Sequence, residues 1–497
     1  MFDRAAGILL AVSSLPSRHG IGTFGAAARG WIDFLRDAGQ KYWQILPLGP
    51  TGWGDSPYQS FSAFAISPYY IDLDTLLEQG LLNREELEAV SWGSKPYRVY
   101  YAGQYQQRGK ILRRAFAKFR EDPSAYDGAA FQAFREKHGF WLDNYSLFMA
   151  LKRNNRGASW LEWSNRLRFR DEKALATYRT KLADDIEYYS YTQFLAYTQW
   201  ESLKAYANSQ DVAIIGDIPI YVAMDSADVW SASELFQLDD QRRPMRVAGC
   251  PPDPFSADGQ LWGNPLYHWD ALAQTGYAWW LSRLRSCAAL YDVTRIDHFR
   301  GFESYYSIPA GEKDARTGEW VKGPGRFFIE AINREMPEAR IIAEDLGYLT
   351  PEVKDLLRAS GYPGMKVLQF AFDSREASDY MPYTFDRHCV VYTGTHDNPT
   401  SIEWLKTAGF NDVALAREYL GLRDIREGNW AFIRAALASV ANLAVIPMQD
   451  YLGLGSIARM NTPSTTGGNN WRWRVQTEAL TGDLAQRISR LARIYGR

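Results

Sequence analysis

The 497-residue sequence contains only three cysteines, Cys250, Cys287 and Cys389, and none of them lies in a CxxC pattern. Such isolated cysteines argue against a disulfide framework and suit a reducing compartment, so we expect a cytoplasmic protein. Long apolar runs are also missing. The N-terminal run Gly7–Val12 is too short to span a bilayer and lacks a signal-peptide cleavage pattern, so we interpret it as a strand.

Charge of one sign is lacking as well, because 56 Lys and Arg oppose 58 Asp and Glu without a run of like charges. This balance argues against a nucleic-acid-binding tail and a polybasic membrane patch. The sequence has no Gly-rich phosphate-binding turn, no GxxxxGK pattern and no EF-hand loop. We therefore expect a neutral partner, with no cofactor, metal, nucleic acid or membrane involved.

Aromatic residues, in contrast, are abundant: they make up 14% of the chain, with 18 Trp and 30 Tyr. Indole and phenol rings have flat apolar faces and a polar rim, which match the CH face and hydroxyl edge of a pyranose. Dense aromatic packing is the alternative explanation. The composition favours sugar binding.

Short apolar runs bounded by turn residues predict buried strands. Between the first two of them, Trp31, Phe34, Leu35 and Ala38 follow helical spacing, and Gly39 stands where a helix cap belongs. Strand, helix, strand is the repeating unit of a barrel. The eight predicted strands are Gly7–Val12, Tyr42–Leu48, Val212–Ile218, Val293–Ile296, Arg340–Ala343, Met365–Phe370, Val390–Tyr392 and Leu443–Pro447.

The uneven spacing of these runs predicts an α/β fold, a (β/α)₈ TIM barrel with inserted, largely helical and loop subdomains around its C-terminal mouth. We expect one catalytic unit across the whole chain, with the barrel formed by about 1–55, 208–222 and 270–497. Helical periodicity predicts a helical insertion at about 56–207, after the second strand. The segment at about 223–269, after the third strand, is dense in Gly and Pro and is expected to be an irregular, ordered loop over the mouth.

Three of the predicted strands lead into an acid. Val293-Thr-Arg-Ile-Asp297, Arg340-Ile-Ile-Ala-Glu344 and Cys389-Val-Val-Tyr-Thr-Gly-Thr-His-Asp397 each place a carboxylate where a barrel enzyme carries its chemistry. Retaining cleavage of a glycosidic bond needs one carboxylate nucleophile and one carboxylic acid, about 5 to 5.5 Å apart. These acids therefore point to catalysis on a glycosidic bond.

Side-chain alternation places Arg295 and Asp297 on the same side of their strand, so the guanidinium is expected to hold Asp297 ionised with a low pKa, as a nucleophile requires. Glu344 ends an apolar run, where partial burial would raise its pKa toward that of a general acid. The alternative is a structural ion pair and a helix-capping glutamate.

The trio His396, Asp397 and Asn398 is expected to bind adjacent sugar hydroxyls, with Asp397 stabilising the transition state. His298 also lies next to a candidate acid. A zinc site is the competing interpretation, but neither histidine occurs in an HxxxH or CxxH pattern, and hydroxyl binding explains both.

Several longer motifs span nearly the whole chain: Ser13-Ser-Leu-Pro16, Trp43-Gln-Ile-Leu-Pro-Leu-Gly-Pro50, Asp55-Ser-Pro-Tyr58, Gly216-Asp-Ile-Pro-Ile-Tyr-Val222, Pro251–Pro265, Arg295-Ile-Asp-His-Phe-Arg-Gly301, Ala343-Glu-Asp-Leu-Gly347, Gly394-Thr-His-Asp-Asn398 and Arg459-Met-Asn461. With them the sequence resembles the 4-α-glucanotransferase family, also called amylomaltase or disproportionating enzyme, a relative of the α-amylases. The resemblance implies the same three acids in the same roles. It also implies sugar contacts from Tyr58, Asp217, Arg295, His298 and His396, where a loop or supporting role is the alternative for Tyr58 and Asp217.

On the acceptor side, the resemblance implies that Gln260 and Trp262 belong to a loop that folds over the acceptor and that Asn461 belongs to the facing loop. Asp373, after the sixth strand, is a further candidate for an acceptor hydroxyl, with a surface acid as the alternative. The sequence departs from the family pattern at Ala257–Asp258, where some relatives carry Glu. This departure puts an acceptor-loop carboxylate contact in doubt.

The resulting expectation is an enzyme that moves α-1,4-glucan segments from a donor maltooligosaccharide, starch or glycogen chain to the 4-hydroxyl of an acceptor, through a covalent glycosyl-aspartate. An α-amylase-type hydrolase would share the three acids but would release a reducing end for every bond broken. A cyclodextrin-forming or debranching-associated transferase would share the first half-reaction, and a non-catalytic glucan-binding protein would keep the aromatic residues. Both a monomer and a homodimer remain open.

Overall fold

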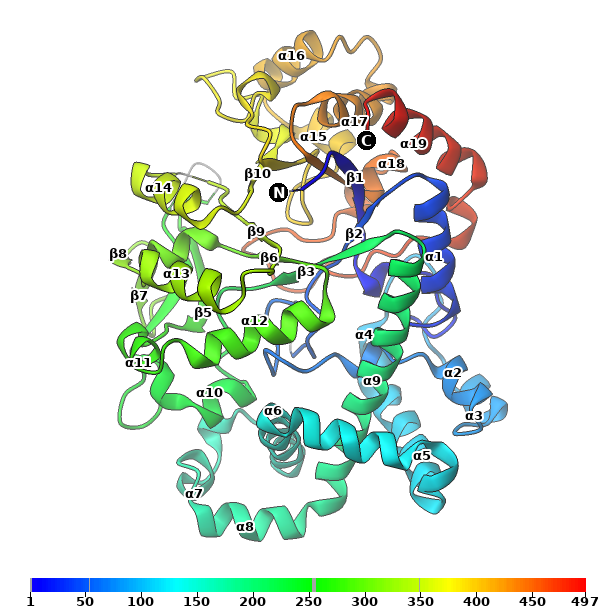
Figure 1. The fold of residues 1–497 in the computed structure, drawn as a ribbon, viewed down its shortest axis with the longest axis vertical. Coiled ribbons are helices and arrows are strands. Elements are labelled where there is room, and N and C mark those ends of the chain that lie inside the picture. The colour runs from blue at the N-terminus through cyan, green and yellow to red at the C-terminus, as the bar shows by residue number, and fades with distance from the viewer. Residues whose placement is uncertain (1, 53, 253–255, 348) are drawn as a thin grey trace.

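A computed structural model describes residues 2–52, 54–252, 256–347 and 349–497 (Figure 1). Its centre is a sheet of eight parallel strands in the order β10-β11-β12-β1-β2-β3-β6-β9. The strands are β1 (Ala5–Leu9), β2 (Tyr42–Gln44), β3 (Ala213–Ile218), β6 (Val293–Ile296), β9 (Ile341–Ala343), β10 (Gly364–Val367), β11 (Cys389–Tyr392) and β12 (Leu443–Pro447).

The two end strands of this sheet, β9 and β10, meet and close it into a barrel. The Ala343 N–H donates to the Pro363 carbonyl at 3.0 Å, and the Met365 N–H donates to the Asp345 carboxylate at 2.6 Å. Helices surround the ring of strands (Figure 1). The predicted (β/α)₈ barrel is confirmed.

Some of the predicted strands are longer than the observed ones. The run Tyr42–Leu48 forms a strand only as far as Gln44, and in Met365–Phe370 the strand ends at Val367 before a 3₁₀ turn. The chain stays buried beyond the end of the strand, since Leu46 is only 5% exposed. A buried loop therefore has the same apolar composition as a buried strand.

The helices outside the barrel include the one predicted from helical spacing, α1 (Ala26–Asp37). Its buried face contains Trp31, Phe34 and Leu35, and Gly39 follows it with φ of 68°. The left-handed conformation at this position favours glycine at the end of the helix. The other helices of the ring are α12 (Ala278–Leu290), α13 (Gly325–Glu335), α14 (Pro351–Ser360), α15 (Ser401–Thr407), α16 (Phe410–Tyr419), α17 (Gly428–Ala438), α18 (Met448–Tyr451) and α19 (Gly482–Ile494).

Between β2 and β3, where the sequence predicts a helical insertion, the chain forms helices α2 to α9, several of which lie at the bottom of Figure 1. The helix α9 also leads back into β3 and so joins this layer to the barrel. The bounds are α2 (Leu73–Glu78), α3 (Arg84–Glu88), α4 (Tyr101–Gly103), α5 (Gly109–Glu121), α6 (Gly128–Asn154), α7 (Asn165–Arg168), α8 (Glu172–Lys181) and α9 (Ala183–Ser209), with a π-helical turn at Gln104–Arg108.

After β3, the expectation that the Gly- and Pro-rich runs are irregular is wrong. β4 (Arg246–Cys250) and β5 (Gln260–Pro265) pair antiparallel and join β7 (Ser304–Pro309) and β8 (Glu319–Lys322) in a second sheet, ordered β5-β4-β7-β8. Two glycines of this region are required by the backbone. Gly259, directly before β5, has φ of 67°, and a Cβ at Gly249 would collide with the Gln260 carbonyl. In sequence, α10 (Ala227–Ser231) precedes β4, and α11 (Trp269–Gln274) follows β5. Asp253, Pro254 and Phe255 of the motif Pro251–Pro265 lie outside the described residues.

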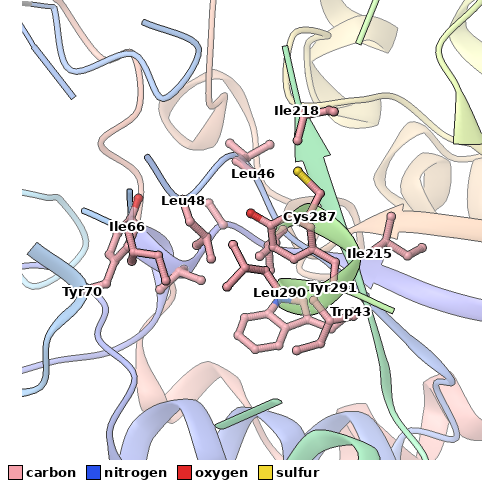
Figure 2. Packing of buried hydrophobic residues seen from close by; sticks show 14 of the residues in the cluster. Trp43, Leu46, Leu48, Ile66, Tyr70, Ile215, Ile218, Cys287, Leu290 and Tyr291 are labelled. Carbon is pink, nitrogen blue, oxygen red and sulfur yellow. The ribbon is translucent and has the colours of Figure 1, made fainter. Parts of the chain in front are cut away.

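Aromatic and aliphatic side chains pack behind β2 and β3, as Figure 2 shows for Trp43, Ile215, Leu290 and Tyr291. The Tyr291 ring lies against Gly216, where a Cβ would overlap the ring. This packing on Gly216 supports the strand on which the next residue is Asp217. Within the part of the chain that the structure describes, no helix combines the length and apolarity that crossing a bilayer requires.

Candidate active site

Four acidic side chains come together at the carboxyl ends of the barrel strands. Asp217 lies in β3, Asp297 and Glu344 directly follow β6 and β9, and Asp397 follows β11. Parallel strands in a closed barrel end at the same rim, which is where barrel enzymes place their reactive groups. The three acids predicted from sequence therefore lie at one mouth.

Arg295 connects two of these acids. β3 and β6 pair so that Arg295 is opposite Asp217, and its Nη1 lies 2.6 and 2.7 Å from the two Asp217 oxygens. The same Nη1 lies 3.1 Å from Oδ1 of Asp297. Arg295 and Asp297 thus point the same way, as strand alternation predicts, while Asp217 shares the cation from the neighbouring strand.

The expected low pKa of Asp297 is not supported by this geometry. Burial raises the pKa of the Asp297 carboxyl well above its ordinary range, and Arg295 only partly opposes that shift. The positive charge of Arg295 is already shared with Asp217, and the carboxyls of Glu344, Asp217 and Asp397 add further upward contributions. Sequence alternation identifies the cation but not the number of acids around it.

Glu344 is held by two backbone donors. The N–H of His298 donates to one carboxylate oxygen at 2.6 Å, and the N–H of Leu346 donates to the other at 2.7 Å. Burial raises the pKa of Glu344, and Asp345 adds to the rise, whereas Arg295 and the two N–H groups oppose it. The ion pair with Arg295 thus opposes the upward pKa shift of Asp297, and burial together with Asp345 raises the pKa of Glu344.

Asp397 is the most accessible of the acids, with 44% of its side chain exposed. Its Oδ1 accepts a 2.6 Å hydrogen bond from the amide of Asn461, and its Oδ2 lies 3.4 Å from Nε2 of His396. Asn398, for which the sequence predicts a contact with sugar hydroxyls, accepts hydrogen bonds from the Thr395 N–H and hydroxyl through its side-chain oxygen. Asn398 therefore closes the turn that presents Asp397.

Tyr58 joins the acids through both its hydroxyl and its ring. The hydroxyl donates to Oδ2 of Asp217 at 2.7 Å, and the ring stacks on His396 with centroids 5.1 Å apart and an angle of 17°. Trp471 completes this aromatic group at 5.9 Å from both rings. The aromatic group forms one wall beside Arg295 and Asp397.

The second sheet reaches the same mouth through Trp262. Its ring meets the His298 ring edge-on, with centroids 4.9 Å apart, and its indole N–H donates to the Gln260 side chain at 3.1 Å.

Burial lowers the pKa of His298 to about 3 and also lowers the pKa of His396, so both imidazoles are neutral at neutral pH. The described residues contain no group of three or more His, Cys, Asp or Glu able to hold a metal ion, which leaves the zinc interpretation without support.

Asp373 is not joined to these acids. It accepts hydrogen bonds at 2.6 to 2.9 Å from the backbone and guanidinium of Arg375, which lower its pKa to about 2. In the divergent Ala257–Asp258 pair, the Asp258 carboxylate lies 3.7 Å from the exposed Arg316. Both acids thus have arginine partners of their own.

Two contacts at the site were not predicted from the sequence. Trp471, in a left-handed conformation with φ of 63°, was hidden among many tryptophans. Arg459 donates at 2.8 Å to the carbonyls of Asp397 and Asn461 and so ties the loop after β11 to the loop after β12. Its position in the motif Arg459-Met-Asn461 was the available signal.

Comparison with known proteins adds three findings. Residues 10–481 match the sequence model of the family described as 4-alpha-glucanotransferase. The chain is 46% identical to the 4-alpha-glucanotransferase of Clostridium butyricum, covering 98% of this chain and 99% of that one, and 46% identical to that of Thermus thermophilus, covering 98% of each. An amylomaltase from Streptococcus agalactiae, solved with acarbose, is 39% identical over 99% of both chains, with a TM-score of 0.95.

Proposed function

The chain belongs to the 4-alpha-glucanotransferase family and is a 4-α-glucanotransferase, and from this premise we propose that it transfers α-1,4-glucan segments by a retaining double displacement. The observation that carries the mechanism is the pairing of two unlike carboxyls at one mouth. Asp297 has a cation at 3.1 Å and is 29% exposed, whereas Glu344 is 9% exposed, so burial favours the proton on Glu344. Such a difference in surroundings separates a nucleophile from an acid.

In the first half-reaction a donor glucan lies across the barrel mouth. Asp297 attacks the anomeric carbon, the glycosidic bond breaks, and Glu344 gives its proton to the departing 4-oxygen. The products are a glucan ester on Asp297 and a free fragment with a new non-reducing end. Arg295 stabilises the ionised Asp297 before attack.

In the second half-reaction Glu344, now ionised, removes the proton from the 4-hydroxyl of an acceptor glucan or glucose. The acceptor oxygen attacks the same carbon, the ester bond breaks, and the α configuration is restored. Asp397, oriented by Asn461 at 2.6 Å, accepts hydrogen bonds from sugar hydroxyls that strengthen in the transition state. Tyr58, Asp217, His298 and His396 line the donor side in this proposal.

The acceptor must compete with water at the ester. Trp262 contacts His298 and bonds to Gln260, and both Trp262 and Gln260 lie on β5, which pairs with β4. This pairing supports a rigid acceptor site. A bound acceptor hydroxyl has a large effective concentration and excludes water from the ester. We assign these two residues to the acceptor side, and we leave Asp373 out of the acceptor site because Arg375 holds it.

A cytoplasmic location is part of the proposal. It rests on the sparse cysteines, of which Cys287 and Cys389 are buried free thiols in this structure. Maltooligosaccharides, amylose and glycogen are the proposed substrates.

The test is incubation with maltotriose as the sole substrate, with glucose, longer oligosaccharides and total reducing ends measured in the same samples. A ladder of longer chains at constant total reducing ends is the expected result, and Asp297→Asn should abolish it. If reducing ends rise with each bond cleaved and no longer chain forms, the transfer mechanism is refuted in favour of hydrolysis.

A further inference from the structure

The segment from Thr393 to Ser401 connects β11 to α15 and carries His396 and Asp397. Both of its ends meet a single carboxylate, that of Asp450 in α18, which follows β12 directly. Asp450 is only 1% exposed and has no part in the mechanism described above. Burying a carboxylate costs free energy unless hydrogen bonds compensate it, so the contacts of Asp450 indicate its role.

Asp450 accepts three hydrogen bonds from the two ends of the segment. At the first end the Thr393 hydroxyl donates to Oδ2. At the second end the Ser401 N–H donates to Oδ1 at 2.7 Å, and the Ser401 hydroxyl donates to Oδ2 at 2.8 Å. One rigid planar group thereby fixes the separation of the two residues between which the segment turns.

Asp450 is itself held in place. The Asn429 amide, from α17, donates to the Asp450 carbonyl at 2.8 Å. Burial raises the pKa of Asp450, and the Thr393 and Ser401 donors oppose that rise. The carboxylate is therefore stabilised in the core by hydrogen bonds from neutral donors.

The middle of the segment is tied to the same side of the barrel, because Arg459 donates to the Asp397 carbonyl. With the ends and the middle fixed, the backbone at Asp397 has little freedom. A displacement of about 1 Å in a group that must meet a transition state can cost about 10²-fold in rate. The position of Asp397 therefore depends on contacts made well behind the mouth.

We propose that Asp450 is a positioning residue of this transferase, which acts through Asp397 by holding both ends of the segment that presents it. The inference rests on the proposed role of Asp397 in stabilising the transition state. Asp450 does not touch the sugar. It sets where the Asp397 carboxylate stands when the ring flattens.

The test is a double-mutant cycle between Asp450→Asn and Asp397→Asn, with fluoride release from α-maltosyl fluoride as the rate. Asparagine keeps the shape of aspartate, but its NH₂ group would face the Thr393 and Ser401 hydroxyls, which donate to the carboxylate in the wild-type protein. We expect Asp450→Asn to lower kcat about tenfold or more with KM changed less than about threefold, and to change the rate less than about twofold in the Asp397→Asn background.

Asp228 provides a matched control, because it is another buried carboxylate that accepts a backbone N–H, that of Ala63 at 2.8 Å. Asp228→Asn should have the same small effect on rate in both backgrounds. If the fold-changes in rate caused by Asp450→Asn and Asp397→Asn instead multiply in the double variant, Asp450 acts independently of Asp397. The inference is then overturned, while the role of Asp397 stands. If Asp397→Asn alone leaves kcat near wild type, the proposed function of Asp397 fails, and the inference fails with it.

A second pair of variants keeps the test valid if Asp450→Asn does not fold. Thr393→Val keeps the side-chain shape and removes the hydroxyl, whereas Thr393→Ser keeps the hydroxyl and removes the methyl group. We expect kcat to fall about fivefold in the valine variant and to stay within about twofold in the serine variant. The reverse order would show that packing, and not the bond to Asp450, positions the segment.

Discussion

The backbone N–H of His298 donates a 2.6 Å hydrogen bond to the carboxylate of Glu344. This N–H reaches the carboxylate from a left-handed turn, since His298 has φ of 53° directly after Asp297. The residue after the proposed nucleophile therefore orients the proposed acid. The chain geometry at one strand end couples the two reacting groups.

If Glu344 is the proton donor, Glu344→Gln should affect donors according to their need for a proton. We expect transfer from maltotriose to fall about 10³-fold, within the usual range for a lost general acid. The first-turnover burst of fluoride from α-maltosyl fluoride should stay within about tenfold of wild type, because fluoride leaves without protonation, whereas later turnovers also need Glu344 as the base. Single-turnover rates with both donors provide the comparison, and an equal loss with both would remove Glu344 from that role.

The pH profile should be sensitive to Asp345. The active form has Glu344 protonated, so activity falls as pH rises past the pKa of Glu344. The negative charge of Asp345 contributes to raising that pKa, so Asp345→Asn should move the alkaline limb of kcat/KM to lower pH. Asparagine can still accept from the Met365 N–H through its oxygen, which keeps the contact that closes the barrel.

The exposed Asp386 provides the control for this shift, since Asp386→Asn removes the same charge at the surface. Its profile should overlay that of wild type. An alkaline limb that stays in place in Asp345→Asn, or that moves to higher pH, would contradict the electrostatic role of Asp345.

The sequence was sufficient to predict the barrel and the acids at its mouth, because both follow from local pattern. Arg295 and Asp297 share a face by strand alternation, and the apolar run before Glu344 indicates a buried strand end. The pairing of β3 with β6, which places Asp217 opposite Arg295, is a tertiary fact. The upward pKa shift of Asp297 comes mainly from burial, with contributions from Glu344, Asp217 and Asp397, and depends on tertiary contacts that the sequence does not reveal.

Other parts of the site depend on residues that are distant in the chain. Trp471 lies against Tyr58, and Asp450 holds Thr393, but no spacing rule connects either pair. The antiparallel β4 and β5 were missed because their glycines, such as Gly249, resemble loop residues in composition. In the structure that glycine permits close approach of two strands, which composition alone does not reveal.

Gly216 should tolerate no side chain, because a Cβ there would overlap the Tyr291 ring. We expect Gly216→Ala to destabilise the protein by about 1 to 3 kcal/mol or more through overpacking, measured by thermal or denaturant unfolding. Gly30 is the matched control: it is exposed in α1, and a Cβ there has open space within 4 Å. Gly30→Ala should stabilise by about 0.5 to 1 kcal/mol, and equal effects at the two sites would contradict the packing argument.

Trp262 should control the partition of the glucan ester between acceptor and water. Its indole lies edge-on to His298 at 4.9 Å and bonds to Gln260, so Trp262→Ala removes the apolar surface while Trp262→Phe keeps a ring and loses the N–H. With maltotriose, we expect the alanine variant to release more new reducing ends per transfer event, by about tenfold, because acceptor binding weakens and water enters. The phenylalanine variant should lie nearer to wild type. The ester forms before the acceptor binds, so fluoride release from α-maltosyl fluoride should change much less than the partition does. If fluoride release and transfer fall together while the ratio of transfer to hydrolysis stays constant, Trp262 supports Glu344 through His298 and does not select the acceptor.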